Sequence, residues 1–171
     1  MLDGYVTEHS RIKREISELY KHLITLEQDP PRILAMYEWR HELLQSLVQD
    51  INPHAFENLW VELAIDLQVI CHSIFDCYYE KIKAMKKIPQ DSMLETMNKY
   101  GTEAIKVAER IIKLLIKKEE KFEYTQVIIN KRLSIGQICT KLYFKEISEW
   151  INSHKNALDN YKLLKSFLDE Y

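Results

Sequence analysis

The stretch HAFENLWVELAIDLQVICHSIFDCYYEKIKAMKK, residues 54–87, decides the fold that this sequence predicts. Apolar residues in its middle fall on nearly every side of a helix, namely Leu63, Ile65, Leu67, Val69, Ile70, Ile74 and Phe75. A helix that is apolar all round lies inside a protein and is covered by its neighbours. Lysines crowd the C-terminal end of the stretch, where cations interact favourably with the helix dipole. We therefore predict a long central helix over residues 53–86.

Two amphipathic runs precede this central helix. In the first, apolar residues recur at the three- and four-residue steps of a helix, at Ile12, Ile16, Leu19, Leu23 and Leu26. This run predicts a helix over residues 7–29, with Thr7 as its N-cap. The second run predicts a helix over residues 31–51. The pair Pro30-Pro31 separates the two helices, because proline is tolerated only in a first helical turn.

Asn52 and Pro53 separate the second run from the central helix. Asparagine is a favoured N-cap residue, and proline is favoured at the first helical position. We therefore predict that Asn52 caps the central helix and orients it against the second helix.

Three further helical runs follow the central helix. They predict helices over residues 92–121, 123–146 and 148–171. Asp91 or Ser92 is expected to cap the first of these. Gly101 is expected to bend or restart that helix, because glycine weakens a helix interior. Gly136, inside the next run, predicts the close approach of a neighbouring backbone.

The scarcity of turn residues sets the fold class. Three glycines and four prolines in 171 residues leave few turns, and no strand is predicted. Short connections make successive helices antiparallel neighbours, so we predict an all-α fold of about six helices in antiparallel hairpins, in one domain over residues 1–171. Ala157-x3-Tyr161 matches the spacing in the second helix of a tetratricopeptide repeat, and Ala104-x3-Ala108 half matches it. These pairs are too far apart for the repeat of roughly 34 residues, so hairpins of this kind would be overlong.

The totals argue against several functional classes. With 24 basic and 26 acidic residues and a net charge of -2, the chain is not predicted to bind nucleic acid. No run approaches the roughly 18 apolar residues of a membrane span, so no membrane insertion is predicted. Three cysteines form no disulfide framework, which is typical of a reducing compartment. The sequence therefore predicts a cytoplasmic protein.

Two candidate metal sites fail on spacing. His41-Glu42 begins the zinc-protease motif H-E-x-x-H, but residue 45 is glutamine, so the second ligand is missing. Cys71 and Cys77 lie roughly 120° apart around a helix, which does not suit a shared ion. Together with His72 they are interpreted as two buried thiols and an imidazole at the helix surface.

One metal hypothesis is kept as an alternative. Glu38-x-x-His41 has the spacing that di-iron helical bundles use. Those bundles need a second copy of the pair and two further core glutamates, for which the pattern offers no candidates. Glycine-rich nucleotide motifs are also missing from the sequence. We therefore predict no enzyme, no cofactor and no metal, with a metal carrier or enzyme built on Glu38 and His41 as the alternative.

The first third of the chain carries a more specific pattern. Its residues are Asp3-Gly4-Tyr5-Val6-Thr7, His9, Leu19, Lys21, Leu23, Glu27, Asp29, Arg32, Met36, Arg40, Leu44, Leu47, Asp50 and Asn52-Pro53. This pattern resembles a segment in the C-terminal region of KIF-binding proteins, which regulate kinesin motors. The match runs without a gap from Leu19 to Pro53 and includes polar residues, so a helical period alone does not produce it. The rest of the chain resembles the family more loosely.

The resemblance implies a fold and a partner. Members of that family are solenoids of tetratricopeptide-like helical pairs that bind kinesin motor domains and keep them off microtubules. It therefore implies a non-enzymatic interaction module, cytoplasmic and associated with the cytoskeleton. In the family, Asp-Gly-Tyr-Val lies well inside a longer chain, so we expect this chain to be the C-terminal portion. A helical scaffold with an unrelated protein partner is the alternative.

The partner surface is predicted at the end of the second helix. Partners of helical repeats usually lie along the concave face and its bordering loops. The surface with which kinesin binds microtubules is basic, because the microtubule is acidic. The resemblance therefore implies that a regulator which covers this surface presents acids and neutral hydrogen-bonding groups. Asp50 and Asn52 match the family there, Gln49 and His54 lie beside them, and Glu57 follows one turn later. In the simpler interpretation, Asp50 and Asn52 only shape a helix connection.

Overall fold

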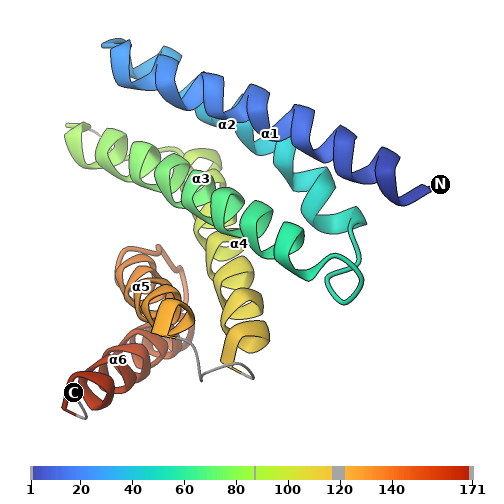
Figure 1. The fold of residues 1–171 in the computed structure, drawn as a ribbon. Helices are drawn as coiled ribbons and strands as arrows, with labels where there is room; N and C mark the ends of the chain where they lie inside the picture. Colours follow the sequence, from blue (N-terminus) through green and yellow to red (C-terminus); the bar gives the residue numbers. More distant parts are fainter. Residues whose placement is uncertain (1, 87, 117–121, 170–171) are drawn as a thin grey trace.

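The computed structural model describes residues 2–86, 88–116 and 122–169, and its regular structure there is entirely helical. The helices are α1 (Leu2–Leu26), α2 (Pro30–Asp50), α3 (Glu57–Ala84), α4 (Asp91–Leu115), α5 (Phe122–Cys139) and α6 (Ile147–Asp169) (Figure 1). The prediction of an all-α fold is therefore confirmed. Helix ends predicted at residues 121 and 171 lie outside the described residues. None of the helices in these ranges has the length and apolar character needed to span a membrane.

Helix α3 is central, as its sequence predicts. It packs against α2 on one side and α4 on another, and Figure 1 shows these helices between α1 and the α5–α6 pair. Its side chains Leu63, Ile70, Ile74 and Phe75 are fully buried. Each burial of this kind contributes about 1.5–3 kcal/mol relative to an exposed side chain. Val69 is the exception in the apolar middle, being half exposed.

Polar side chains also join helices that do not follow one another. Arg14 of α1 pairs with Asp66 of α3 at 3.0 Å and also contacts Glu62 there. Gln68 of α3 donates to the Ser134 hydroxyl of α5 at 2.8 Å. These contacts bring the first helix of each hairpin next to the first helix of the following hairpin. The hairpins α1–α2, α3–α4 and α5–α6 therefore stack, while the tetratricopeptide-like solenoid itself stays a prediction.

The predicted N-cap of α3 is wrong. The helix begins at Glu57, and Phe56 occupies the cap position without a side-chain hydrogen bond. Asn52 instead closes a separate turn, because its Oδ1 accepts from the His54 N–H at 2.9 Å and its carbonyl accepts from the Phe56 N–H at 3.1 Å. Phe56 has φ -128° and ψ 51°, outside the helical region, so this turn does not continue into α3.

Two other predicted caps are also wrong. Helix α1 begins before Thr7, which therefore lies inside the helix. At α4 the cap position belongs to Gln90, and neither Asp91 nor Ser92 occupies it. In both cases the helix begins at or before the polar residue that the pattern selects.

Helix α5 ends at Cys139, seven residues short of the predicted 146. The segment that follows crosses to α4, where Asn98 accepts from the Tyr143 N–H at 3.1 Å and donates to the Tyr143 carbonyl. Lys145 then pairs with Asp91 at 2.9 Å. These contacts with a distant helix hold the segment outside a helical path.

Gly101 in α4 and Gly136 in α5 allow close packing. Helix α4 continues through Gly101 without a break, where an added Cβ would come within 2.8 Å of Phe75 Cδ2 and 2.9 Å of Leu142 Cδ2. At Gly136 an added Cβ would lie 2.7 Å from the Tyr161 ring. The close approach predicted at Gly136 is therefore to a side chain and not to a backbone.

Gly101→Ala is expected to lower the free energy of unfolding by up to about 2 kcal/mol. Overpacking a closed core costs about 1–3 kcal/mol, and replacing glycine by alanine in a helix returns about 1 kcal/mol. Phe75 is fully buried and has no room to move aside. Urea unfolding followed by circular dichroism measures the difference. Gly136→Ala is the matched control, because Tyr161 is 37% exposed and can swing outward. Equal losses at both glycines would contradict this account.

Candidate functional site

The predicted partner surface lies at the connection between α2 and α3. Gln49 and Asp50 are exposed in the last turn of α2, and Asn52 and His54 are exposed in the turn that follows. Glu57 is the first residue of α3 and is partly buried. The structure therefore brings the five residues to one corner of the fold, which we call the α2–α3 corner.

These residues face three separate hollows. Asp50 and Asn52 line a hollow of about 510 Å³ shared with His9 and Lys13 of α1. Gln49 lines another, of about 490 Å³, against α4. Glu57 borders a third hollow of about 310 Å³, towards the end of α4. None of these three hollows collects all five side chains, and His54 lines none of them.

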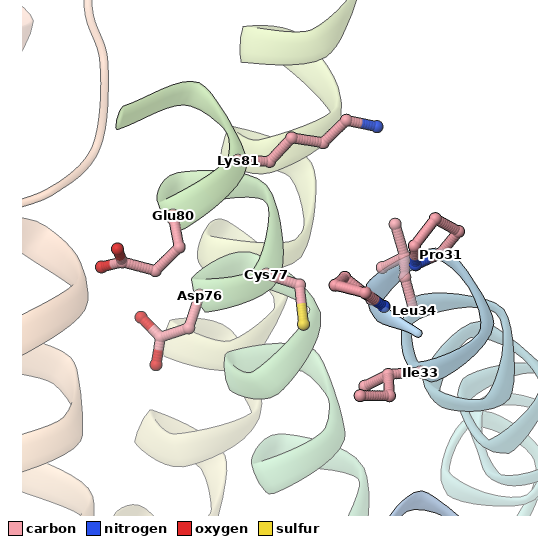
Figure 2. A pocket seen from close by; sticks show the side chains of 8 residues that line it. Pro31, Ile33, Leu34, Asp76, Cys77, Glu80 and Lys81 are labelled. Atoms are coloured by element: carbon pink, nitrogen blue, oxygen red, sulfur yellow. The ribbon is translucent and has the colours of Figure 1, made fainter. Parts of the chain in front are cut away.

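A fourth, strongly apolar pocket lies between the start of α2 and the C-terminal half of α3. It has a volume of about 590 Å³, and Pro31, Ile33 and Leu34 form its α2 wall. Figure 2 shows the Cys77 sulfur directed towards this wall, whereas Asp76 points away from it. Burial raises the pKa of the Cys77 thiol, and the charge of Asp76 raises it further, so the sulfur is a neutral apolar group at neutral pH. Nothing in the sequence analysis selected this pocket, because its two walls come from different helices.

Helix α1 leaves its apolar stripe exposed. The stripe consists of Ile12, Ile16, Leu19, Leu23 and Leu26, with exposed fractions between 38% and 79%. The side that α1 turns towards α2 is small and polar instead. Ser17 is buried there and accepts a hydrogen bond from Arg40 Nε at 3.1 Å. A contiguous exposed apolar stripe of this length is typical of an interaction surface.

The residues of the alternative metal hypothesis do not meet. Glu38 accepts a hydrogen bond from the Tyr78 hydroxyl at 3.3 Å. His41 turns instead to α4, where its Nε2 lies 3.0 Å from Glu103 Oε2. Glu38 and His41 therefore contact different helices, α3 and α4, and the E-x-x-H spacing does not build a shared site here.

Cys71, His72 and Cys77 also separate, as their spacing predicts. Cys71 is fully buried, and His72 Nδ1 lies 2.9 Å from the Ser134 hydroxyl of α5. Burial lowers the pKa of His72, although the charge of Asp76 opposes that shift. The imidazole is therefore part of the interface between α3 and α5 and not a group at the helix surface.

The structure assembles a different group of ligand-type side chains. One ligand atom each from His41, Cys71 and Glu103 lies within 4.8 Å of the other two. The three residues come from α2, α3 and α4, so no sequence spacing could reveal them. Burial raises the pKa of the Glu103 carboxyl, but hydrogen bonds and charge from His41, together with the Gln45 amide, lower it more. Glu103 is therefore ionised at neutral pH.

These features define a class of protein. The described residues form stacked helical hairpins that carry an apolar pocket, an exposed apolar stripe and several shallow hollows. Such surfaces suit the binding of another protein, since apolar patches rimmed by polar residues are typical of interaction sites. The described residues therefore define an all-helical protein whose surfaces suit a protein partner.

The family model described as KIF-1 binding protein C terminal matches residues 1–170. The chain therefore belongs to this family, which confirms the resemblance seen in its first third. It is 24% identical to the KIF-binding protein of Xenopus tropicalis over 98% of this chain and 28% of that protein. It is 30% identical to the KIF-binding protein of Gallus gallus over 71% of this chain and 18% of that protein.

Coverage of the relatives is partial. The KIF-binding protein of Bos taurus is 21% identical over 99% of this chain but only 28% of its own length. The chain thus spans about 28% of the curated relatives that match it along its whole length. No solved structure matches the chain.

Proposed function

We propose that this chain is a non-enzymatic module that binds kinesin motor domains and hinders their attachment to microtubules. The observation that carries the proposal is the family match over residues 1–170, with relatives that are named KIF-binding protein. A protein with this role would work in the cytoplasm, on the cytoskeleton. Stacked helical hairpins support the role because they present long, stable surfaces to a partner.

We assign contact with the motor to the α2–α3 corner. Gln49 and Asp50 are exposed at the end of α2, where an amide and a carboxylate can meet basic side chains. Asn52 has a different role, because its side chain already accepts the His54 N–H and shapes the turn. The corner therefore combines two exposed polar groups with one residue that shapes the turn after them.

Replacing the two exposed groups tests this assignment. The double variant Gln49→Ala/Asp50→Lys is expected to weaken motor-domain binding by about tenfold, which is about 1.4 kcal/mol. The reason is that a charge reversal at an interface sets like charges against each other. Biolayer interferometry with immobilised kinesin motor domains measures the affinity.

Asp159→Lys is the matched control, since this exposed residue of α6 carries the same charge far from the corner in the sequence. It should leave the affinity unchanged. A charge reversal on the motor that restores binding to the double variant would place the corner in the interface. Unchanged affinity of the double variant, with its helical content intact, would remove the corner from it. Failure of the wild-type chain to bind any motor domain would contradict the proposed function for this chain on its own.

A further inference from the structure

We propose that His41, Cys71 and Glu103 form a binding site for a zinc-class divalent cation at the junction of α2, α3 and α4. The proposal rests on geometry, because the three ligand-type atoms lie within 4.8 Å of one another. They are supplied by three helices that also pack closely through apolar contacts. The evidence for this site does not depend on the proposed kinesin binding.

The ligand set selects the metal. Zinc is bound by cysteine sulfur, histidine nitrogen and carboxylate oxygen, at about 2.0–2.3 Å. Tetrahedral bonds of that length set neighbouring ligand atoms roughly 3.5 Å apart, so closing on an ion requires shifts of about 1 Å or less. Calcium and magnesium prefer sites made of oxygen alone, which this set does not offer. Three protein ligands leave a fourth position for water.

The surroundings hold the three side chains in place. Gln45 Nε2 donates to Glu103 Oε1 at 3.1 Å, which leaves the other carboxylate oxygen towards His41. The Tyr100 ring meets the His41 ring edge-on, with 5.2 Å between the centroids. Partners of this kind orient metal ligands and are needed for tight binding. His41 is 4% exposed and Cys71 is fully buried, so both rest in fixed positions.

The hollow of about 490 Å³ between α2 and α4 reaches one member of the trio, because Glu103 lines it together with Gln45, Gln49 and Thr102. The Glu103 side chain is 19% exposed and the His41 side chain is 5% exposed. An ion would enter through this hollow, bind the carboxylate first, and keep a water molecule on the hollow side. Binding to Cys71 would displace the thiol proton to solvent, because the buried thiol is neutral without the ion.

The competing interpretation needs no ion. In it, His41 Nε2 and Glu103 Oε2 form a hydrogen bond across 3.0 Å, and the Cys71 thiol only fills the core beside them. The two interpretations differ in one respect that can be measured. Of the three cysteines in the chain, Cys71 alone would bond to the ion, and it would do so only if the metal site exists.

Cobalt(II), which substitutes for zinc and absorbs light when a thiolate binds it, is the probe. Titration of the purified chain is expected to give a sulfur-to-cobalt absorption band that saturates at one equivalent, and added zinc should abolish it. Cys71→Ala should remove the band, and Glu103→Gln should weaken cobalt binding at least tenfold. Cys77→Ala is the matched control on the same helix and should keep the band.

X-ray absorption of the zinc-loaded wild-type chain provides a test that needs no variant. One sulfur and two or more nitrogen or oxygen ligands around zinc would support the site. A shell without sulfur would overturn the proposal, even if variants at the site failed to fold. So would a missing cobalt band, or a band that Cys77→Ala removes and Cys71→Ala does not.

Discussion

Replacing Trp60 by alanine is expected to lower the free energy of unfolding by about 3–5 kcal/mol, the range for large aromatic side chains removed from a packed core. Trp60 lies in the first turn of α3 and is fully buried. Such a loss is a large share of the roughly 5–15 kcal/mol that stabilises a typical domain. Thermal unfolding by circular dichroism should show a fall in Tm on the order of 10 °C.

The size of the effect follows from the three helices that Trp60 joins. Its Nε1 donates to the Val48 carbonyl at 3.0 Å. That carbonyl is among the last four of α2, which have no partner within their own helix. On the other side, the guanidinium carbon of Arg110 in α4 lies 4.7 Å from the ring centroid. Alanine would leave a cavity and would remove the hydrogen-bond donor of the Val48 carbonyl. It would also remove the ring that lies against the Arg110 guanidinium.

Two further variants separate these contributions. Trp60→Phe keeps an aromatic ring and loses the N–H, so its expected cost is about 1–3 kcal/mol. Trp39→Ala removes the same side chain from a position in α2 that is 51% exposed. Its cost should stay below about 1 kcal/mol. If Trp39→Ala and Trp60→Ala destabilised the protein equally, Trp60 would not be the joint between α2, α3 and α4.

The central helix shows what a local pattern can predict. The apolar residues in its middle, which include Leu63, Ile70 and Phe75, fall on nearly every side of the helix. Such a helix requires neighbours on several sides, whatever those neighbours are. The structure buries all three. Fold class and the number of helices follow from such patterns together with the scarcity of glycine and proline. Neither prediction needs knowledge of which residues touch across helices.

Helix ends and interhelical contacts were harder to predict because they depend on distant residues. Asn52 has the chemistry of an N-cap, yet its side chain accepts the His54 N–H and closes a turn. That turn precedes the true start of α3 at Glu57. The exposed stripe of α1 has the same period as a buried one, and the buried Ser10 and Ser17 show which side packs. Periodicity gives the faces of a helix, but not which face is covered.

The candidate sites divide in the same way. Asp50 matches the family within one continuous segment and Gln49 lies beside it, and both are exposed at the end of α2. The trio His41, Cys71 and Glu103 spans three helices, so its members share no spacing along the chain. Each of them alone is an ordinary residue. Only the packing of α2, α3 and α4 turns them into a group with metal-binding chemistry.

Lys131 is a buried lysine at the interface of α3 and α5, with 6% of its surface exposed. Its Nζ donates to Gln68 Oε1 at 2.6 Å. Burial lowers the pKa of the ammonium group, the charge of Asp66 opposes the shift, and the result is about 8 against an ordinary value of 10.5. Asp66 offers only this partial compensation because it also pairs with Arg14 at 3.0 Å.

This shift predicts how stability depends on pH. Below about pH 8, Lys131 is protonated in both states, and the cost of burying its charge acts in full. Between about 8 and 10.5, the folded chain has lost a proton that the unfolded chain still binds, so the free energy of unfolding rises with pH. At about 1.4 kcal/mol per pH unit, the gain from this lysine is about 3 kcal/mol across the interval.

Lys131→Met removes this contribution, so the stability of the wild type minus that of the variant should rise by about 3 kcal/mol between roughly pH 7.5 and 10.5. Urea unfolding at a series of pH values measures it.

Two tyrosines also make stability depend on pH. Burial raises the pKa of Tyr78, and that of Tyr100 to about 12, so the unfolded chain ionises first at these groups and stability falls with pH. That effect is common to both proteins and cancels in the difference. Lys131→Arg keeps its charge throughout and should show no rise of its own. A wild-type-to-Met difference that is constant with pH would mean that Lys131 keeps its proton when folded, and that Gln68 compensates its buried charge.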